Sequence, residues 1–407
     1  MACFPLSSDP TVACAGRRTL RWLGLMLMIV GLSACAGGMG AGRGSGQKET
    51  AAPARSETAK PAPTAAGNRI KVALLAPLSG DNAALGAALL NAAQVALFDH
   101  ADERLALLPR DTQGTAAGAA VALRTAMADG AQMAIGPLFA AEVAAIRGEA
   151  QAGGLPLLAF TNDQTQAGGS AYLLGFLPGD QVVRVLGFAS SRGVKRVASL
   201  APRGAYGDVV AKALHQQAER LGLTVVWEER YDPAADLSLA VANVAAHKEF
   251  DALLVAEGGE RLKTLAPLLA AQGLDARSVR LLGTGLWDDP ALGQEMALVG
   301  GWFAAPTAAA RADFEARYKE LYKEQPPRLA SLAYDAMALA AVLARTSPGT
   351  PFASAALTNP SGFSGIDGLF RLTPAGVAER SLAVLEVAPG RARVADPAPT
   401  SFPPLTH

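Results

Sequence analysis

Apolar runs of strand length alternate with longer segments of helical character along most of this chain. Four apolar runs in the first part predict buried strands, at 70–76, 105–108, 133–135 and 155–160. Helices are predicted between them, from 79–81 to about 100, at 115–128 and from about 140. After Pro178 the rhythm repeats, with strands at about 196–200, 223–230, 251–256 and 279–283 and helices at 180–191, 206–221, 236–247 and 260–272.

The last third adds helices at about 309–324 and 329–345 and a strand pair around 369–371 and 383–387. Strands that alternate with helices predict an α/β fold, in which a mostly parallel sheet carries helices on both faces. About 320 residues of this pattern exceed what one hydrophobic core holds, so two lobes are predicted.

The chain begins with a pattern typical of export. Arg17, Arg18 and Arg21 precede an uncharged stretch at 22–32, and Leu32-Ser33-Ala34-Cys35 follows. Basic residues, a short apolar stretch and small residues describe a secretory signal. An apolar stretch of about 11 residues is too short for a bilayer span, which needs about 20. The alternative is an apolar segment with a buried cysteine.

The Leu-Ser-Ala-Cys sequence resembles the lipobox of bacterial lipoproteins. That resemblance implies that residues 1–34 are a signal peptide and that Cys35 is lipidated and anchors the protein to a membrane. Ala36 stands where an Asp would retain such a lipoprotein at the inner membrane, which implies the outer membrane. Residues 35–68 have the composition of a flexible tether, and Pro-rich residues 393–407 predict an irregular tail.

Composition narrows the range of functions. Lys+Arg and Asp+Glu balance at 36 each, and the folded part has no basic cluster with interleaved aromatic residues, so nucleic-acid binding is not expected. The four histidines form no H-x-x-H pair, and no G-x-S-x-G or P-loop segment occurs. The S-x-x-K match at 45–48 lies in the tether. We therefore expect a protein without enzymatic activity, metal or cofactor.

Several short segments together resemble the type I periplasmic binding proteins, in particular the leucine/isoleucine/valine-binding group. They are 76–80 (APLSG), 135–138 (IGPL), 154–158 (GLPLL), 205–207 (AYG) and 333–336 (AYDA). The resemblance covers about 69–392. It implies two lobes joined by three hinge crossovers, with a small-molecule ligand in the cleft between them. By analogy, lobe 1 comprises 69–177 plus 302–346, and lobe 2 comprises 178–301 plus 347–392.

A narrower resemblance rests on three segments. They are 160–163 (FTND), 283–289 (GTGLWDD) and 362–371 (GFSGIDGLFR). These segments are similar to those of a lipoprotein subgroup described as penicillin-binding-protein activators. That subgroup has the same fold and is thought to act on peptidoglycan synthases.

Ligands of open α/β sheets bind beyond the carboxyl ends of the strands. Candidate ligand-binding residues are therefore Ser79, Gly80, Phe139, Ala140, Thr161, Asn162, Asp163, Tyr206, Glu257 and Trp287. Each also has a structural interpretation. Ser79 and Thr161 could instead cap helices, and Asp163 could be a solvent-exposed turn residue. Tyr206 could pack at the start of a helix, and Trp287 could be buried in a hydrophobic core.

Two positions depart from the pattern that the resemblance implies. Amino-acid binders of that family carry a Ser, which holds the ligand carboxylate, where this chain has Ala140. Asp163 stands where a carboxylate would approach, and like charges in a closed cleft repel. A cationic, amino-sugar or peptide-like ligand would suit Asp163 better, and an empty cleft is equally allowed.

Two functions remain open. The first is a lipid-anchored periplasmic receptor that captures an amino-acid-like, amino-sugar or peptide-like solute for an ABC transporter or a signalling partner. The second is an outer-membrane lipoprotein that activates a penicillin-binding protein by protein–protein contact.

Overall fold

The computed structural model describes residues 69–403 except 235, 248 and 391. The first sheet is parallel, with strand order β2-β1-β3-β4-β5. Its strands are β1 (Ile70–Ala76), β2 (Leu105–Asp111), β3 (Met133–Ile135), β4 (Leu157–Ala159) and β5 (Ala171–Leu173). The intervening helices are α1 (Ala83–His100), α2 (Ala116–Ala128) and α3 (Ala140–Ala152).

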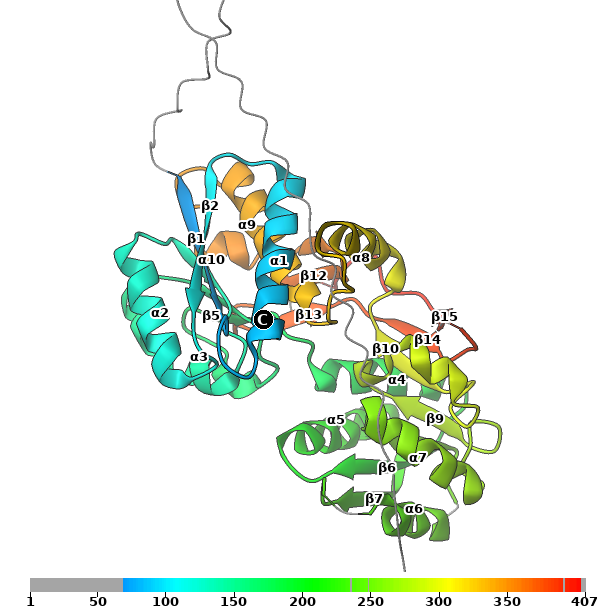
Figure 1. Ribbon diagram of the computed structural model, residues 1–407. Coiled ribbons are helices and arrows are strands. Elements are labelled where there is room, and N and C mark those ends of the chain that lie inside the picture. Colours follow the sequence, from blue (N-terminus) through cyan, green and yellow to red (C-terminus); the bar gives the residue numbers. More distant parts are fainter. Residues whose placement is uncertain (1–68, 235, 248, 391, 404–407) are drawn as a thin grey trace, which may run out of the picture. The chain divides into compact units, whose positions relative to one another are not determined.

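Strand β1 shows why these residues form a central strand. Its side chains alternate between two cores, because successive residues of a strand point to opposite faces. Val72 and Leu74 pack with α1 and helix α9 (Ala330–Thr346), whereas Ala73 and Leu75 pack with α2 and α3. Helices therefore cover both faces of the sheet (Figure 1), and a strand buried on both faces is a continuous apolar run.

The second sheet has strand order β15-β14-β10-β9-β8-β6-β7. Its strands are β6 (Arg196–Pro202), β7 (Thr224–Tyr231), β8 (Ala252–Val255), β9 (Arg280–Gly283), β10 (Trp302–Ala305), β14 (Ala383–Glu386) and β15 (Arg393–Asp396). Strands β6 to β10 run parallel, and β14 and β15 add antiparallel pairs. The accompanying helices are α4 (Pro178–Ser191), α5 (Ala205–Leu221), α6 (Leu237–Ala246) and α7 (Gly259–Ala271).

A third, antiparallel sheet contains β11 (Phe363–Gly365), β12 (Gly368–Leu372) and β13 (Ala378–Arg380). Phe370 and Leu372 of this sheet share one core with α1, α9 and helix α8 (Ala308–Tyr322). We call the first and third sheets with α1–α3, α8, α9 and α10 (Ser354–Leu357) lobe 1, and the second sheet with α4–α7 lobe 2. Short 3-10 turns complete the fold: η1 (Gln164–Gln166), η2 (Gly285–Trp287) and η3 (Pro290–Gln294).

The chain passes between the lobes three times: after β5, after β10 and after β13. The fold is thus a two-lobed α/β structure with mostly parallel sheets flanked by helices, as predicted. Among the described residues, no helix is both long and apolar enough to cross a membrane. The predicted signal peptide and the whole predicted tether, Cys35 included, lie outside the described residues.

The predicted limits of the lobes need correction in the last third of the chain. Strand β10, expected in lobe 1, pairs with β9 and β14 in lobe 2, and β11–β13, expected in lobe 2, pack on the core of lobe 1. The predicted pairing of 369–371 with 383–387 is wrong, because β12 pairs with β11 and β13 instead. The predicted irregular tail contains β15. These strands are three to five residues long, so distant partners decide their placement.

Candidate functional site

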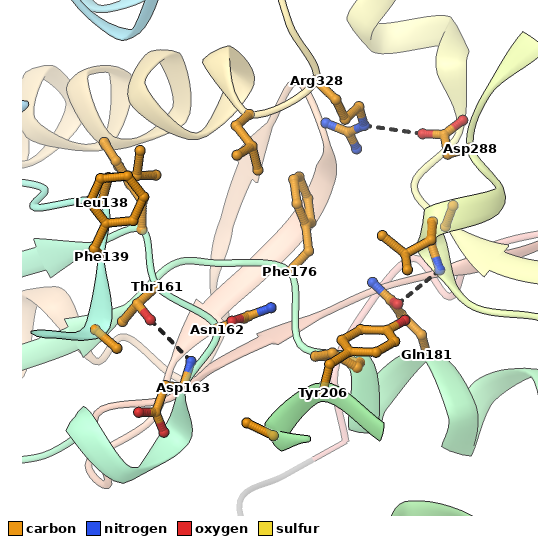
Figure 2. Close-up of a pocket in the computed structure, with 18 of the residues that line it drawn as sticks. Leu138, Phe139, Thr161, Asn162, Asp163, Phe176, Gln181, Tyr206, Asp288 and Arg328 are labelled. Carbon is orange, nitrogen blue, oxygen red and sulfur yellow. Dashed lines mark hydrogen bonds and ion pairs between the residues drawn. The ribbon is translucent and has the colours of Figure 1, made fainter. Parts of the chain in front are cut away.

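A pocket of about 680 Å³ lies between the two lobes. Its walls are mostly apolar, and its labelled side chains come from loops of both lobes and from the first turns of α4 and α5 (Figure 2). The lining residues from lobe 1 and the first crossover are Leu85, Leu138, Phe139, Ala140, Phe160, Thr161, Asn162, Asp163, Phe176, Arg328 and Leu329. Those from lobe 2 and the second crossover are Pro178, Gln181, Ala205, Tyr206, Gly285, Leu286, Asp288, Ala305 and Pro306.

The amino terminus of α3 meets the pocket at Phe139 and Ala140. The backbone N–H of Phe139 donates to the carboxylate of Glu142, with N and Oε2 2.8 Å apart. Burial raises the pKa of Glu142 even though the hydrogen bonds from Thr112 and Phe139 oppose that shift. The chain's own carboxylate therefore occupies this helix end, where an anionic ligand group could otherwise bind.

The turn after β4 carries Thr161, Asn162 and Asp163. The Asp163 carboxylate accepts hydrogen bonds from the backbone N–H and hydroxyl of Thr165, at 3.0 and 2.7 Å, and from the Gln166 amide at 3.2 Å. The Thr165 hydroxyl bond is the main reason that the pKa of Asp163 is lowered despite partial burial. Asp163 therefore stabilises its own turn, and its preference for a cationic ligand stays a prediction.

The lobe 2 wall is held by hydrogen bonds between different elements. Tyr206, at the start of α5, places its hydroxyl 2.7 Å from the hydroxyl of Thr284, which precedes η2. Burial raises the pKa of Tyr206 to about 12, so the hydroxyl remains protonated at neutral pH. The Gln181 side-chain oxygen accepts from the Gly285 N–H at 2.8 Å (Figure 2). These bonds join α4 and α5 to the turn after β9.

Arg328, immediately before α9, is the one cationic side chain among the described residues that line the pocket. Its Nε donates to Asp288 Oδ2 at 3.1 Å, the bond drawn in Figure 2. Its Nη1 donates to Ser331 at 2.8 Å and to Asp367 at 3.1 Å, and its Nη2 lies 2.8 Å from the second Asp367 oxygen. The guanidinium carbon lies 4.3 Å from the ring centroid of Phe176, which is a favourable cation–π distance.

Further buried charges surround this arginine. Arg311 of α8 lies 3.1 Å from Asp288 and 3.5 Å from Asp367. Arg380 of β13 lies 3.7 Å from Asp335 of α9. We call these six residues the junction cluster: Asp288, Arg311, Arg328, Asp335, Asp367 and Arg380. The cluster joins lobe 2, through Asp288, to α8, α9 and the third sheet of lobe 1.

The pKa values of the two innermost acids of the junction cluster are shifted in opposite directions. Burial, followed by the charge of Asp367, raises the pKa of Asp335 to about 7. Burial also acts on Asp367, but Arg328 and Arg380 outweigh it and hold the pKa of Asp367 below its usual value. Asp335 also accepts the backbone N–H of Ile366 at 2.7 Å, so it ties α9 to the turn between β11 and β12.

Six of the ten predicted ligand-binding residues line the pocket: Phe139, Ala140, Thr161, Asn162, Asp163 and Tyr206. Ser79 and Gly80 do not. The exposed Ser79 hydroxyl donates to Asp111 at 2.6 Å, and Gly80 has a φ of 78° in the turn before α1. This turn follows the carboxyl end of β1, but the Asp111 contact fixes it outside the pocket lining.

Glu257 and Trp287 are also outside the pocket lining. The Glu257 carboxylate accepts from the Tyr231 hydroxyl and lies 3.5 Å from Arg261. Trp287 is 1 % exposed in the core of lobe 2, where it packs near Phe303. The core interpretation of Trp287 is the one that its burial supports.

Five polar or aromatic lining residues are not among the ten candidates: Phe160, Phe176, Gln181, Asp288 and Arg328. Phe176 and Gln181 lie on either side of the first crossover. A search for ligand-binding residues next to this hinge crossover would therefore have found them. Arg328 has no such local signal, because Asp288 and Asp367 are 40 and 39 residues away in the sequence. Among the described residues, no group of His, Cys, Asp and Glu side chains could hold a metal ion.

Comparisons with known proteins agree with this architecture. The model of a family described as periplasmic binding protein matches residues 69–392. A protein from Rhodospirillum rubrum, described as a putative branched-chain amino acid ABC transporter, is 21% identical with a TM-score of 0.71, over 80% of this chain and 99% of that one. The comparison with curated sequences found no significant match.

Two other similar structures contain ligands. A solute-binding protein of an ABC transporter from Rhodopseudomonas palustris, in complex with 3,4-dihydroxybenzoic acid, is 18% identical with a TM-score of 0.64, over 83% of this chain and 98% of that one. The LivJ substrate-binding protein from Streptococcus pneumoniae, in complex with isoleucine, is 21% identical with a TM-score of 0.60, over 81% and 100%. The family match covers most of the chain and the fold is shared, so this protein belongs to the periplasmic binding protein family, with the type I fold.

Proposed function

We propose that this protein is a periplasmic solute receptor that captures a small, mostly apolar organic acid in the pocket between its lobes. The observation that carries the proposal is an apolar pocket with Arg328 as the one cation among its described lining residues. Its volume of about 680 Å³ lies within the range of about 300–1,000 Å³ typical of small-molecule sites. Apolar walls supply affinity, and a few polar groups orient the solute.

A free α-amino acid fits this pocket less well, because it needs partners for both its carboxylate and its ammonium group. Ala140 offers no hydroxyl, and Glu142 already occupies the amino terminus of α3. The two acids that line the pocket, Asp163 and Asp288, are engaged with Thr165 and with arginines. A buried ammonium without a partner is costly.

The solved structures support an organic acid. The R. palustris protein holds an aromatic acid and the S. pneumoniae protein holds isoleucine. Both ligands combine an apolar body with a carboxyl group. By the same likeness, we propose that an ABC transporter receives the solute. From the amino-terminal sequence alone, we propose that lipid on Cys35 anchors the receptor to a membrane.

Binding is tested by calorimetry on the mature chain with benzoate, 4-hydroxybenzoate, phenylacetate, leucine and N-acetylglucosamine. We expect saturable binding of one or more aromatic acids, weakened in Phe139→Ala and unchanged in Ser79→Ala, the control outside the pocket. A ligand at 100 times its Kd should stabilise the fold by about 2.7 kcal/mol. Binding of leucine or the amino sugar alone would contradict the proposal.

The second candidate, activation of a penicillin-binding protein, draws on one observation. The segments 283–289 and 362–371, on which that narrower resemblance rests, supply Asp288 and Asp367, and both acids contact Arg328. The shared segments thus meet in the junction cluster. Assays of purified peptidoglycan synthases with and without the mature chain test this function: stimulated synthesis without any bound solute would favour it over the receptor.

A further inference from the structure

The partners of Arg328 fall into two groups by their position relative to the pocket. Asp288 lines the pocket beside Arg328, whereas Asp367 and Ser331 are absent from its described lining, and the Asp367 side chain has no exposed surface. A guanidinium has five N–H donors in a fixed planar fork. On the pocket side, therefore, an incoming carboxylate meets an arginine whose Nε–H already donates to a carboxylate of the protein.

We propose that Asp288 is an internal competitor that sets the selectivity of the pocket: the carboxylate of a captured solute takes the place of Asp288 on Arg328. This inference rests on the proposed function and names the group that the solute exchanges with. Without the exchange, the solute carboxylate and Asp288 would lie side by side at one cation, which like charges disfavour.

The exchange leaves no acid of the protein unpaired. Asp288 Oδ2 also accepts from Arg311 Nη1 at 3.1 Å, and Arg311 is buried, with its side chain 9% exposed. Arg328 keeps its contacts to Asp367 and Ser331. Each charge therefore retains a partner when the solute enters, which avoids the large penalty for an isolated buried charge.

The bond that is exchanged also connects the lobes. Asp288 follows Trp287, which is fixed in the core of lobe 2, whereas Arg328 precedes α9 of lobe 1. An acidic solute replaces this connection, but a neutral solute of the same shape leaves it in place. Asp288 therefore weakens the binding of acidic solutes relative to that of neutral solutes. Only an acidic solute changes the hydrogen bonds of Arg328.

The test compares benzoate with benzamide, which match in shape and differ in charge. Their affinities are measured by calorimetry for the mature wild-type chain, Asp288→Asn and the control Asp289→Asn. Asp289 is the adjacent acid and caps η3 without contacting Arg328, so its variant removes a charge from nearly the same place. We expect Asp288→Asn to bind benzoate about tenfold more tightly, with benzamide changed less than about twofold and Asp289→Asn resembling wild type.

Unchanged or weaker benzoate binding by Asp288→Asn, or an equal gain for benzamide, would overturn the exchange while leaving the solute receptor intact. Failure of both probes to bind any variant would instead refute the proposed aromatic-acid site, and the exchange with it. If Asp288→Asn does not fold, the exchange can be tested on the wild-type protein alone. The Arg328 Nε–H nuclear magnetic resonance, assigned with Arg328→Lys, should shift with bound benzoate and not with bound benzamide, and no shift on benzoate binding overturns the exchange.

Discussion

Asp163 and Asp288 are both aspartates that line one pocket, yet they are held in opposite ways. Asp163 bonds only to side chains and backbone within three residues of itself among its described contacts. Asp288 bonds to Arg311 and Arg328, which lie 23 and 40 residues further along the chain. The first acid shapes its own turn, and the second joins two lobes.

Only one of these two acids can respond to a solute. A carboxylate that caps its own turn keeps its partners whichever way the lobes move. A carboxylate that pairs with an arginine of the other lobe has a bond that a solute or a lobe movement can replace. The following measurements test this contrast between a local and a long-range acid.

The largest effect is expected for Arg328→Ala. It leaves buried Asp367 without its closest cationic partner and removes the bond to Asp288, so the free energy of unfolding should fall by about 3 kcal/mol. Urea unfolding measures the change. The control is Arg317→Ala, whose exposed pair with Asp99 should be worth less than about 1 kcal/mol. Equal losses in the two variants would remove the distinction between buried and surface pairs.

The pH dependence of stability should reveal Asp335. Its folded pKa of about 7 lies above its ordinary value of 3.8, so the folded state binds more protons between these values. The free energy of unfolding should therefore fall as pH rises from about 4 to 7, by roughly 2–4 kcal/mol. Asp367 has the opposite sign, because its lowered pKa contributes stability that is lost as pH falls below about 4.

Unfolding by urea at several pH values checks this expectation. In Asp335→Asn the decline between pH 4 and 7 should be shallower, and the asparagine oxygen can still accept the Ile366 N–H. Asp129→Asn, which changes a surface acid paired with Arg110, serves as the control and should keep the wild-type slope. The same slope in all three proteins would place the titrating group elsewhere.

A smaller effect is expected for Asp163→Ala. The substitution removes the cap of η1, which should lower the free energy of unfolding by about 1 kcal/mol. Asp236→Ala removes a similar local cap from α6, where Asp236 accepts the Ser238 N–H, and should cost about the same. Thermal or urea unfolding compares the two variants. A loss near 3 kcal/mol for Asp163→Ala alone would show that Asp163 has partners beyond its turn.

The smallest effect is expected for Tyr206→Phe. Its bond to Thr284 is long-range but uncharged, so its loss should lower the free energy of unfolding by about 1 kcal/mol or less. This variant separates the effect of charge from the effect of sequence distance. Ultraviolet titration should also show one tyrosine with a pKa of about 12 in wild type that is missing in Tyr206→Phe. A loss as large as that of Arg328→Ala would mean that distance alone matters.

Much of the fold was predictable, because the signals were local. The apolar runs of β1, β3 and β8 and the helical segments between strands identify an α/β protein by period and length. The pocket loops after β3 and β4 were predictable because parallel strands place their carboxyl ends at one edge. Phe139 and Thr161 followed from that rule. Arg328 did not, since its role depends on its bond to Asp288 of the other lobe.

Local sequence patterns predict the alternation of strands and helices, the two-lobed fold class and the loops that line one side of the pocket. The placement of β10 in lobe 2, the burial of Trp287 in a core and the contact between Asp288 and Arg328 become visible only in the folded protein. The physical reason is the range of the interactions. Hydrophobic period and caps act within a few residues, whereas a buried ion pair needs both partners to be brought together by the packing of whole elements.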